Sequence, residues 1–155
     1  MNTPFGRDVM REFIDAFRAV SIPVCFYFSP DDAWYQWSHG QEPARVRPYA
    51  LPGENPGLLE HDQAQLRELI EGYGPDMLCF DHKPDVARPL VEYARSLDRN
   101  IMITRGILPT PEQALQEDSR GPFEAHFTIG TQWQYKAGND TNKTGRELVE
   151  LLADI

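Results

Sequence analysis

Residues 73–82 read Y-G-P-D-M-L-C-F-D-H, and this stretch decides the fold. The Tyr73-Gly74-Pro75 triplet is typical of the end of a helix, Asp76–Phe80 predicts a short buried strand, and Asp81 follows where that strand ends. In α/β proteins with parallel strands, the carboxyl edge of the sheet is where the chemistry is done. An acid in this position also serves as the cap of a following helix, so the rest of the chain must decide between the two interpretations.

The remaining sequence alternates between helical and strand patterns. Helices are predicted over Arg7–Val20, Asp62–Tyr73 and Asp85–Leu97, in a short segment opened by Thr110-Pro111, and in a last segment opened by the capping-box spacing of Thr144 and Glu147. Strands are predicted over Val24–Phe28, Asp76–Phe80, Asn100–Thr104 and His126–Ile129. The fold class is therefore α/β, with a parallel sheet and helical crossovers. Four strands are half of a (β/α)8 barrel, so the chain forms either a small open sheet or a partial TIM-barrel-like domain.

Three local expectations follow from these patterns. Asp62 and Gln65 have capping-box spacing, which puts a helix start at Asp62 after a long polar connection over residues 29–61. The run V-C-F-Y-F at residues 24–28 has no polar face, as in a strand covered on both sides. Cys25 and Cys79 are then both expected to be buried as small apolar side chains.

Composition indicates one globular domain spanning residues 1–155. The chain has a net charge of −9 and a pI near 4.8, which argues against binding to nucleic acid or to an anionic membrane surface. No apolar run approaches the roughly 18 residues of a transmembrane helix. The first eight residues show no hydrophobic signal region, so we expect a soluble chain and leave its compartment open.

Chemically useful side chains follow the predicted strands. The strand ends supply Tyr27, Asp81 and Arg105, and Glu124, Trp133 and Tyr135 lie around the last strand. Two carboxyl groups with an arginine and aromatic rings suit glycoside hydrolysis, because one carboxylate attacks the anomeric carbon while another acts as acid and then as base. Trp34, in the long connection, either stacks on a sugar or anchors the loop.

Several of these segments occur together, in the same order, in one enzyme family. They are V-C-F-Y-F-S, Y-G-P-D-M-L-C-F-D, I-M-I-T-R-G, T-P-E and F-E-A-H-F-T-I-G-T-Q-W-Q-Y. Together they resemble the central part of the catalytic barrel of the α-L-fucosidases of glycoside hydrolase family 29.

The resemblance implies a retaining α-L-fucosidase that acts on fucosylated glycans or glycosides without a cofactor. It implies that Asp81 is the nucleophile and that Tyr27 and Arg105 contact fucose. The acid/base is Glu124 or Glu112, because the family places this residue differently among its subgroups. We favour Glu124, since it precedes a strand-like segment.

The sequence also departs from the family. The H-H-D-G-F segment, whose histidines bind fucose in the family, has no counterpart in residues 1–155. Uncovered sheet edges would expose unpaired backbone groups, so we expect a homo-oligomer or a complementing chain.

Two alternative functions remain open. One is a carbohydrate-binding or partner-dependent module without catalysis. The other is a metal-dependent barrel hydrolase with ligands drawn from Asp31, Asp32, His39, Asp81 and His82, although no H-x-H or H-E-x-x-H spacing occurs.

Overall fold

The computed structural model describes residues 5–105, 128–130, 137–138 and 141–153. The chain forms two compact units, Met1–Leu108 and Pro109–Ile155, and each is treated by itself. The first unit contains α1 (Val9–Ala19), β1 (Cys25–Phe28), α2 (Ala33–Ser38), η1 (Pro48–Ala50), α3 (Pro56–Tyr73), β2 (Met77–Phe80), α4 (Pro84–Leu97) and β3 (Met102–Thr104). The described part of the second unit contains α5 (Gly145–Ala153). Whether residues 1–155 act as one domain stays a prediction.

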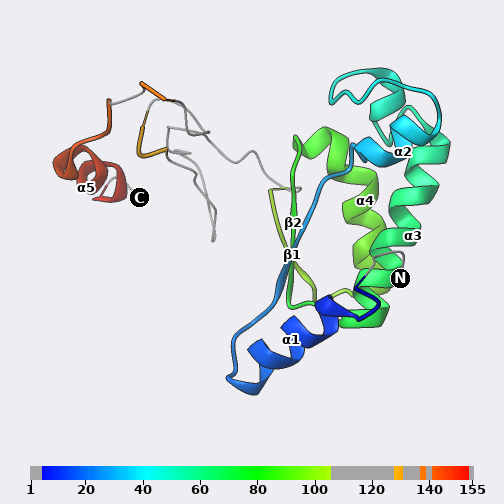
Figure 1. Cartoon of the computed structure of the whole chain (residues 1–155), viewed down its shortest axis with the longest axis horizontal. Helices are drawn as coiled ribbons and strands as arrows, with labels where there is room; N and C mark the ends of the chain where they lie inside the picture. Colours follow the sequence, from blue (N-terminus) through cyan, green and yellow to red (C-terminus); the bar gives the residue numbers. More distant parts are fainter. Residues whose placement is uncertain (1–4, 106–127, 131–136, 139–140, 154–155) are drawn as a thin grey trace. The chain divides into compact units, whose positions relative to one another are not determined.

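The strands form a parallel sheet in the order β1-β2-β3. The register aligns Tyr27 with Cys79 and Cys79 with Thr104, so the three strands end at the same edge. Helices α3 and α4 lie on the same side of this sheet (Figure 1). A strand order that never reverses, with both crossover helices on one face, is the arrangement of a barrel segment and not of a doubly wound sheet. The α/β class and the partial TIM-barrel-like architecture are thus confirmed.

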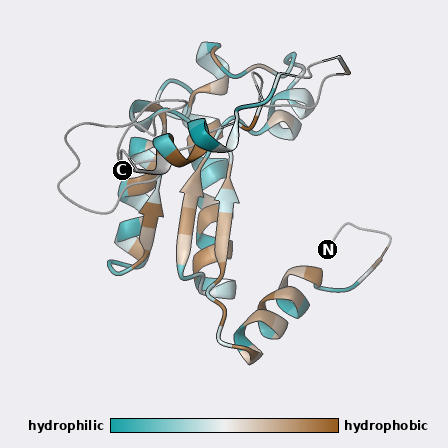
Figure 2. Cartoon of the chain, turned by 90° about the vertical axis from the view of Figure 1, so that its left-hand side faces the viewer, coloured by the Kyte–Doolittle hydropathy of each residue, from teal (hydrophilic) through white to brown (hydrophobic). Residues whose placement is uncertain are grey.

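The core lies between one face of the sheet and the two crossover helices. The strands contribute Phe26, Phe28, Leu78, Phe80 and Ile103, and the helices contribute Leu66, Ile70, Ala87, Leu90, Val91 and Ala94. The strands are predominantly hydrophobic (Figure 2). This hydrophobic layer buries mainly one face of the sheet. It therefore determines which side chains of each strand point toward the helices.

The opposite face of the sheet is only partly covered. The prediction that β1 is covered on both sides is wrong: Cys25 is exposed and Tyr27 is 59% exposed. Buried and exposed side chains alternate along β1, because this strand lies at the edge of the described sheet. The central strand β2 instead buries Leu78, Cys79 and Phe80 in succession. Burial of Cys79 is confirmed, and burial of Cys25 is not.

Helix α3 ends where the sequence predicts. Gly74 is its C-cap and has a φ of 58°, in the left-handed region that glycine adopts without strain. From α1, Arg11 donates to the carbonyl of Gly72, and Arg18 donates to the carbonyls of Tyr73 and Gly74. Two cations at a helix C-terminus neutralise its partial negative charge. These contacts fix α1 at the end of α3.

The start of α3 differs from the prediction. The helix begins six residues before Asp62, and Asn55 is its N-cap, with its side-chain oxygen accepting from the Leu58 amide at 3.3 Å. Asp62 is fully buried inside the helix, and Gln65 bonds to Asp32 instead of capping. The long connection also contains α2 and η1.

The second unit confirms one capping prediction. The amide of Thr144 donates to Glu147, the amide of Glu147 donates to the Thr144 hydroxyl, and α5 begins at Gly145. The predicted strand His126–Ile129 is only partly described, and Thr128 and Ile129 are not in a strand. The short helix predicted at Thr110 lies outside the described residues. No helix in the described part of the chain has the length and hydrophobicity needed to cross a membrane.

Asp62 gives a prediction for stability. Neither of its buried carboxyl oxygens has a hydrogen-bond partner among the described residues. Burial, together with the charges of Asp32 and Asp31, raises the pKa of Asp62 to about 8 from an ordinary 3.8. The folded state therefore keeps a proton that the unfolded state releases. The free energy of unfolding should fall as pH rises from about 4 to about 8, by at most about 1.4 kcal/mol per pH unit.

Asp62→Asn should remove this contribution and should be more stable than the unchanged chain at pH 8. Urea denaturation at pH 5 and pH 8 measures the difference, with Asp15→Asn on the exposed face of α1 as the matched control. An unaltered pH dependence in Asp62→Asn would show that Asp62 titrates normally in the folded protein.

Candidate active site

Asp81 lies at the carboxyl end of the central strand. Its amide donates to the carbonyl of Phe28 at 2.8 Å, which continues the β1–β2 pairing by one residue. This bond places Asp81 beside Tyr27 and Ser29 of the neighbouring strand end, and β3 brings Arg105 to the other side. The side chain of Asp81 is 22% exposed. The strand-end residues Tyr27, Asp81 and Arg105 are thus brought together, as the sequence predicts for a parallel sheet.

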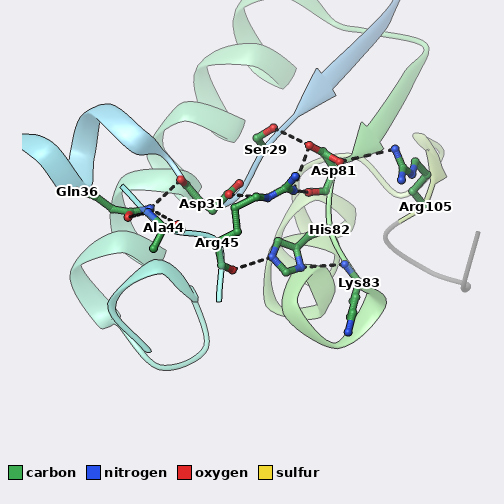
Figure 3. Close-up of polar contacts among 9 residues, drawn as sticks. All are labelled: Ser29, Asp31, Gln36, Ala44, Arg45, Asp81, His82, Lys83 and Arg105. Carbon is green, nitrogen blue, oxygen red and sulfur yellow. Dashed lines mark hydrogen bonds and ion pairs between the residues drawn. The ribbon is translucent and has the colours of Figure 1, made fainter. Parts of the chain in front are cut away.

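The Asp81 carboxylate has polar contacts on several sides (Figure 3). The Ser29 hydroxyl donates to Oδ2 at 3.4 Å, and Arg45 Nη2 donates to Oδ2 at 3.1 Å. The same Nη2 donates to the Asp81 carbonyl at 2.8 Å. Arg105 Nη1 is 3.7 Å from Oδ1. The carboxylate is therefore fixed in one orientation while part of it still faces solvent.

These contacts determine the charge state of Asp81. Its partial burial would raise the pKa of the carboxyl group, but the hydrogen bond from Tyr27 and the charges of Arg45 and Arg105 outweigh burial and lower this pKa. In turn, partial burial and the hydrogen bond to Asp81 raise the pKa of Tyr27 to about 12. The tyrosine ring is largely exposed, so we attribute this shift mainly to the bond between its hydroxyl and Asp81. At neutral pH the site holds a carboxylate and a neutral phenol.

Arg45 is the site residue that the sequence did not reveal. It lies in the loop after α2, and Gln36, fully buried, fixes that loop. The Gln36 side chain accepts from the Ala44 amide at 2.7 Å and donates to the Ala44 carbonyl at 3.0 Å. Only the unusual length of the connection pointed to a site here, and no spacing distinguishes Arg45 from Arg47.

His82 holds the same loop from the other side. Its Nδ1 accepts from the Lys83 amide at 2.9 Å, so the neutral ring carries its proton on Nε2. Nε2 lies 3.1 Å from the Arg45 carbonyl and donates to it. His82 is thus a hydrogen-bonding residue that supports the loop.

Arg105 is held in an unusual backbone conformation. Its φ is 61°, which few residues other than glycine adopt. Such a conformation costs on the order of 1 kcal/mol and is found mostly where the surrounding structure needs it. Here it turns the chain directly after β3, and the side chain, 15% exposed, reaches Asp81.

The other predicted site residues have different outcomes. Trp34 lies on α2 and is 65% exposed, so it does not anchor the loop by burial. The proposed metal ligands are not assembled: Asp31 pairs with Arg45, Asp32 with His61, and no three His, Cys, Asp or Glu side chains among the described residues are placed to hold a metal ion. Four predicted site residues lie outside the described residues: Glu112, Glu124, Trp133 and Tyr135.

The fold and the site define an α/β protein with an ionised aspartate at the carboxyl edge of a parallel sheet. Comparison with protein families identifies the group. The family model for alpha-L-fucosidase matches residues 1–155, the whole chain, and the protein belongs to this family of glycoside hydrolases. Comparison with curated proteins gave no match, and comparison with solved structures gave none either.

The bond between Tyr27 and Asp81 can be tested directly. Tyr27→Phe removes the donor that favours the carboxylate, so the pKa of Asp81 should rise. The carboxyl carbon of Asp81, followed by NMR against pH, measures it. Tyr93→Phe is the matched control, because the Tyr93 hydroxyl bonds to Arg67 at 2.7 Å and not to Asp81. An Asp81 titration that does not move in Tyr27→Phe would contradict the contact.

Proposed function

We propose that this protein is a retaining α-L-fucosidase that releases terminal α-L-fucose from glycans or glycosides, with Asp81 as the nucleophile. The observation that carries the proposal is the ionised Asp81 carboxylate at the end of β2, partly exposed and held by Tyr27, Arg45 and Arg105. A nucleophile must stay ionised at neutral pH and must be open to substrate. Asp81 meets both requirements.

The reaction has two steps. In the first, an Asp81 oxygen attacks the anomeric carbon, the glycosidic C–O bond breaks, and a protonated glutamic acid gives its proton to the leaving oxygen. In the second, the same glutamate takes a proton from water, the water oxygen attacks the anomeric carbon, and the ester bond to Asp81 breaks to restore the carboxylate. We assign the glutamate to Glu124, with Glu112 as the alternative.

The sugar contacts are assigned to residues around Asp81. Tyr27 offers an exposed ring beside the carboxylate, and Arg105 offers a guanidinium group 3.7 Å from it. Such groups bind sugar hydroxyls and the apolar face of a ring. We further assign Trp34, Trp133 and Tyr135 to substrate binding.

A second candidate is carbohydrate binding without catalysis. Trp34 and Trp37 are one turn apart on α2 and are 65% and 68% exposed, an arrangement that suits stacking on sugar rings.

Either function would be helped by assembly with a second copy or a complementing chain. Apolar Met10 and Phe13 on α1 are 42% and 53% exposed, which supports such an association.

Asp81→Asn should abolish hydrolysis of an aryl α-L-fucoside by the purified 155-residue chain, because the amide cannot attack as a carboxylate does. Asp85→Asn is the matched control: Asp85 is exposed in the first turn of α4, and its substitution removes the same charge.

Sedimentation of the active preparation identifies any assembly. A 2-deoxy-2-fluoro-fucosyl fluoride should add one sugar mass to the peptide that contains Asp81.

Turnover that persists in Asp81→Asn would overturn the assignment of the nucleophile. Fucose binding that survives in Asp81→Asn, from a chain that never shows turnover, would favour the second candidate. Isothermal titration with L-fucose measures that binding.

The two glutamates can be separated by azide rescue. Glu124→Ala should lose about 100-fold or more in kcat on a substrate with a poor leaving group. Azide should restore its turnover of an activated aryl fucoside, because the small anion enters the space left by the side chain and attacks the intermediate. Glu112→Ala should show no rescue. Rescue of Glu112→Ala in place of Glu124→Ala would exchange the two roles.

A further inference from the structure

Arg45 joins two carboxylates that come from different parts of the first unit. Its Nε lies 2.9 Å from Asp31 Oδ2, and its Nη2 lies 3.1 Å from Asp81 Oδ2. The carboxylate of Asp31 is 10% exposed, whereas the guanidinium side chain is 56% exposed. A planar guanidinium can serve both acids at once with separate N–H groups. Asp31 therefore aims Arg45 at Asp81.

The backbone of Arg45 is fixed independently of its side chain. The carbonyl of Arg45 accepts from His82, and the preceding residue, Ala44, makes two hydrogen bonds with the buried Gln36. Gln36 also donates to the Asp31 carbonyl at 2.8 Å, so one side chain joins the backbone of Asp31 to the residue that precedes Arg45 (Figure 3). Because both ends of the contact are held, little conformational entropy is lost when Arg45 meets Asp81.

We propose that Arg45 is a positioning residue for Asp81, which fixes the orientation of the nucleophile and favours breakdown of the covalent intermediate over its formation. This role rests on the proposed fucosidase function. Arg45 contacts both the carboxylate and the carbonyl of Asp81 through Nη2, so it restrains the side chain relative to its own backbone. Ser29 shares Oδ2 with Arg45, and Arg105 Nη1 lies 3.7 Å from Oδ1.

The effect on the two steps follows from charge. Attack on the sugar converts the Asp81 carboxylate into a neutral ester, so the attraction to Arg45 is lost. Breakdown of the ester returns the negative charge to Asp81, so the attraction is regained. A fixed cation therefore opposes the first step and assists the second.

Direct titration tests the contact without any need for turnover. The charged and titratable groups that face Asp81 are Tyr27 from β1, Arg45 from the loop, Arg105 after β3 and the adjoining His82. In Arg45→Gln, the NMR titration of the Asp81 carboxyl carbon should move to higher pH, because a cation that favours the carboxylate has been removed. Arg45→Lys should move it less. Arg47→Gln should leave it unmoved, since Arg47 is exposed on the same loop and forms no ion pair with any described residue.

A double variant guards against a folding defect. Arg45→Gln alone leaves the nearly buried Asp31 uncompensated. Asp31→Asn/Arg45→Gln removes both charges and should still move the Asp81 titration to higher pH, by less than Arg45→Gln alone because a neighbouring anion is lost as well. If Asp81 titrates as in the unchanged chain in both variants, the inference is overturned, while the proposed function is untouched.

The kinetic test uses an aryl α-L-fucoside with a good leaving group. In Arg45→Gln, breakdown of the intermediate should slow by roughly tenfold, so kcat and KM should fall together while a full burst of aryl product remains. A lower burst with an unchanged KM would indicate lost active sites and would overturn the role. Turnover that persists in Asp81→Asn would instead remove the proposed function, whatever the titration shows.

Discussion

The parallel pairing of β2 with its two neighbours is the constraint on which the site depends. Since the three strands run in one direction and in close register, their last residues meet at one edge. The bond from the Asp81 amide to the Phe28 carbonyl extends that pairing into the site itself. Asp81, Tyr27 and Arg105 are therefore placed by the sheet, whose position is set in turn by the hydrophobic layer between the strands and α3 and α4. Rigid elements hold a site more accurately than loops do.

Two aspartates of the first unit show how their surroundings decide the chemistry of one side chain. Asp81 faces Arg45, Arg105 and Tyr27, and remains ionised although it is partly buried. Asp62 is fully buried among other acids, without a hydrogen-bond partner in the described part of the chain, and keeps its proton to near pH 8. Donors and cations offset the cost of desolvation in the first case and not in the second. Only the first aspartate is suited to act as a nucleophile at neutral pH.

Sequence patterns predicted the features that depend on local chemistry. Gly74 ends α3, Thr144 and Glu147 cap α5, and the strand-end residues around Asp81 lie together. The failures have long-range causes. Asp62 and Gln65 match a capping box, yet Asn55 caps the helix and tertiary contacts with Asp32 engage Gln65. Cys25 was predicted to be buried but is exposed, because the helices cover the other face of β1. Arg45 reaches Asp81 only through the folded path of its loop, which no spacing in the sequence encodes.

The two hydrogen bonds between Gln36 and Ala44 have a consequence for how the protein can diversify. They join the residues on either side of segment 37–43, so this segment forms a closed surface loop before the chain reaches Arg45. Changes of length or composition within such a surface loop are well tolerated. This segment can therefore change in length or composition while the distance between Arg45 and Asp81 stays the same.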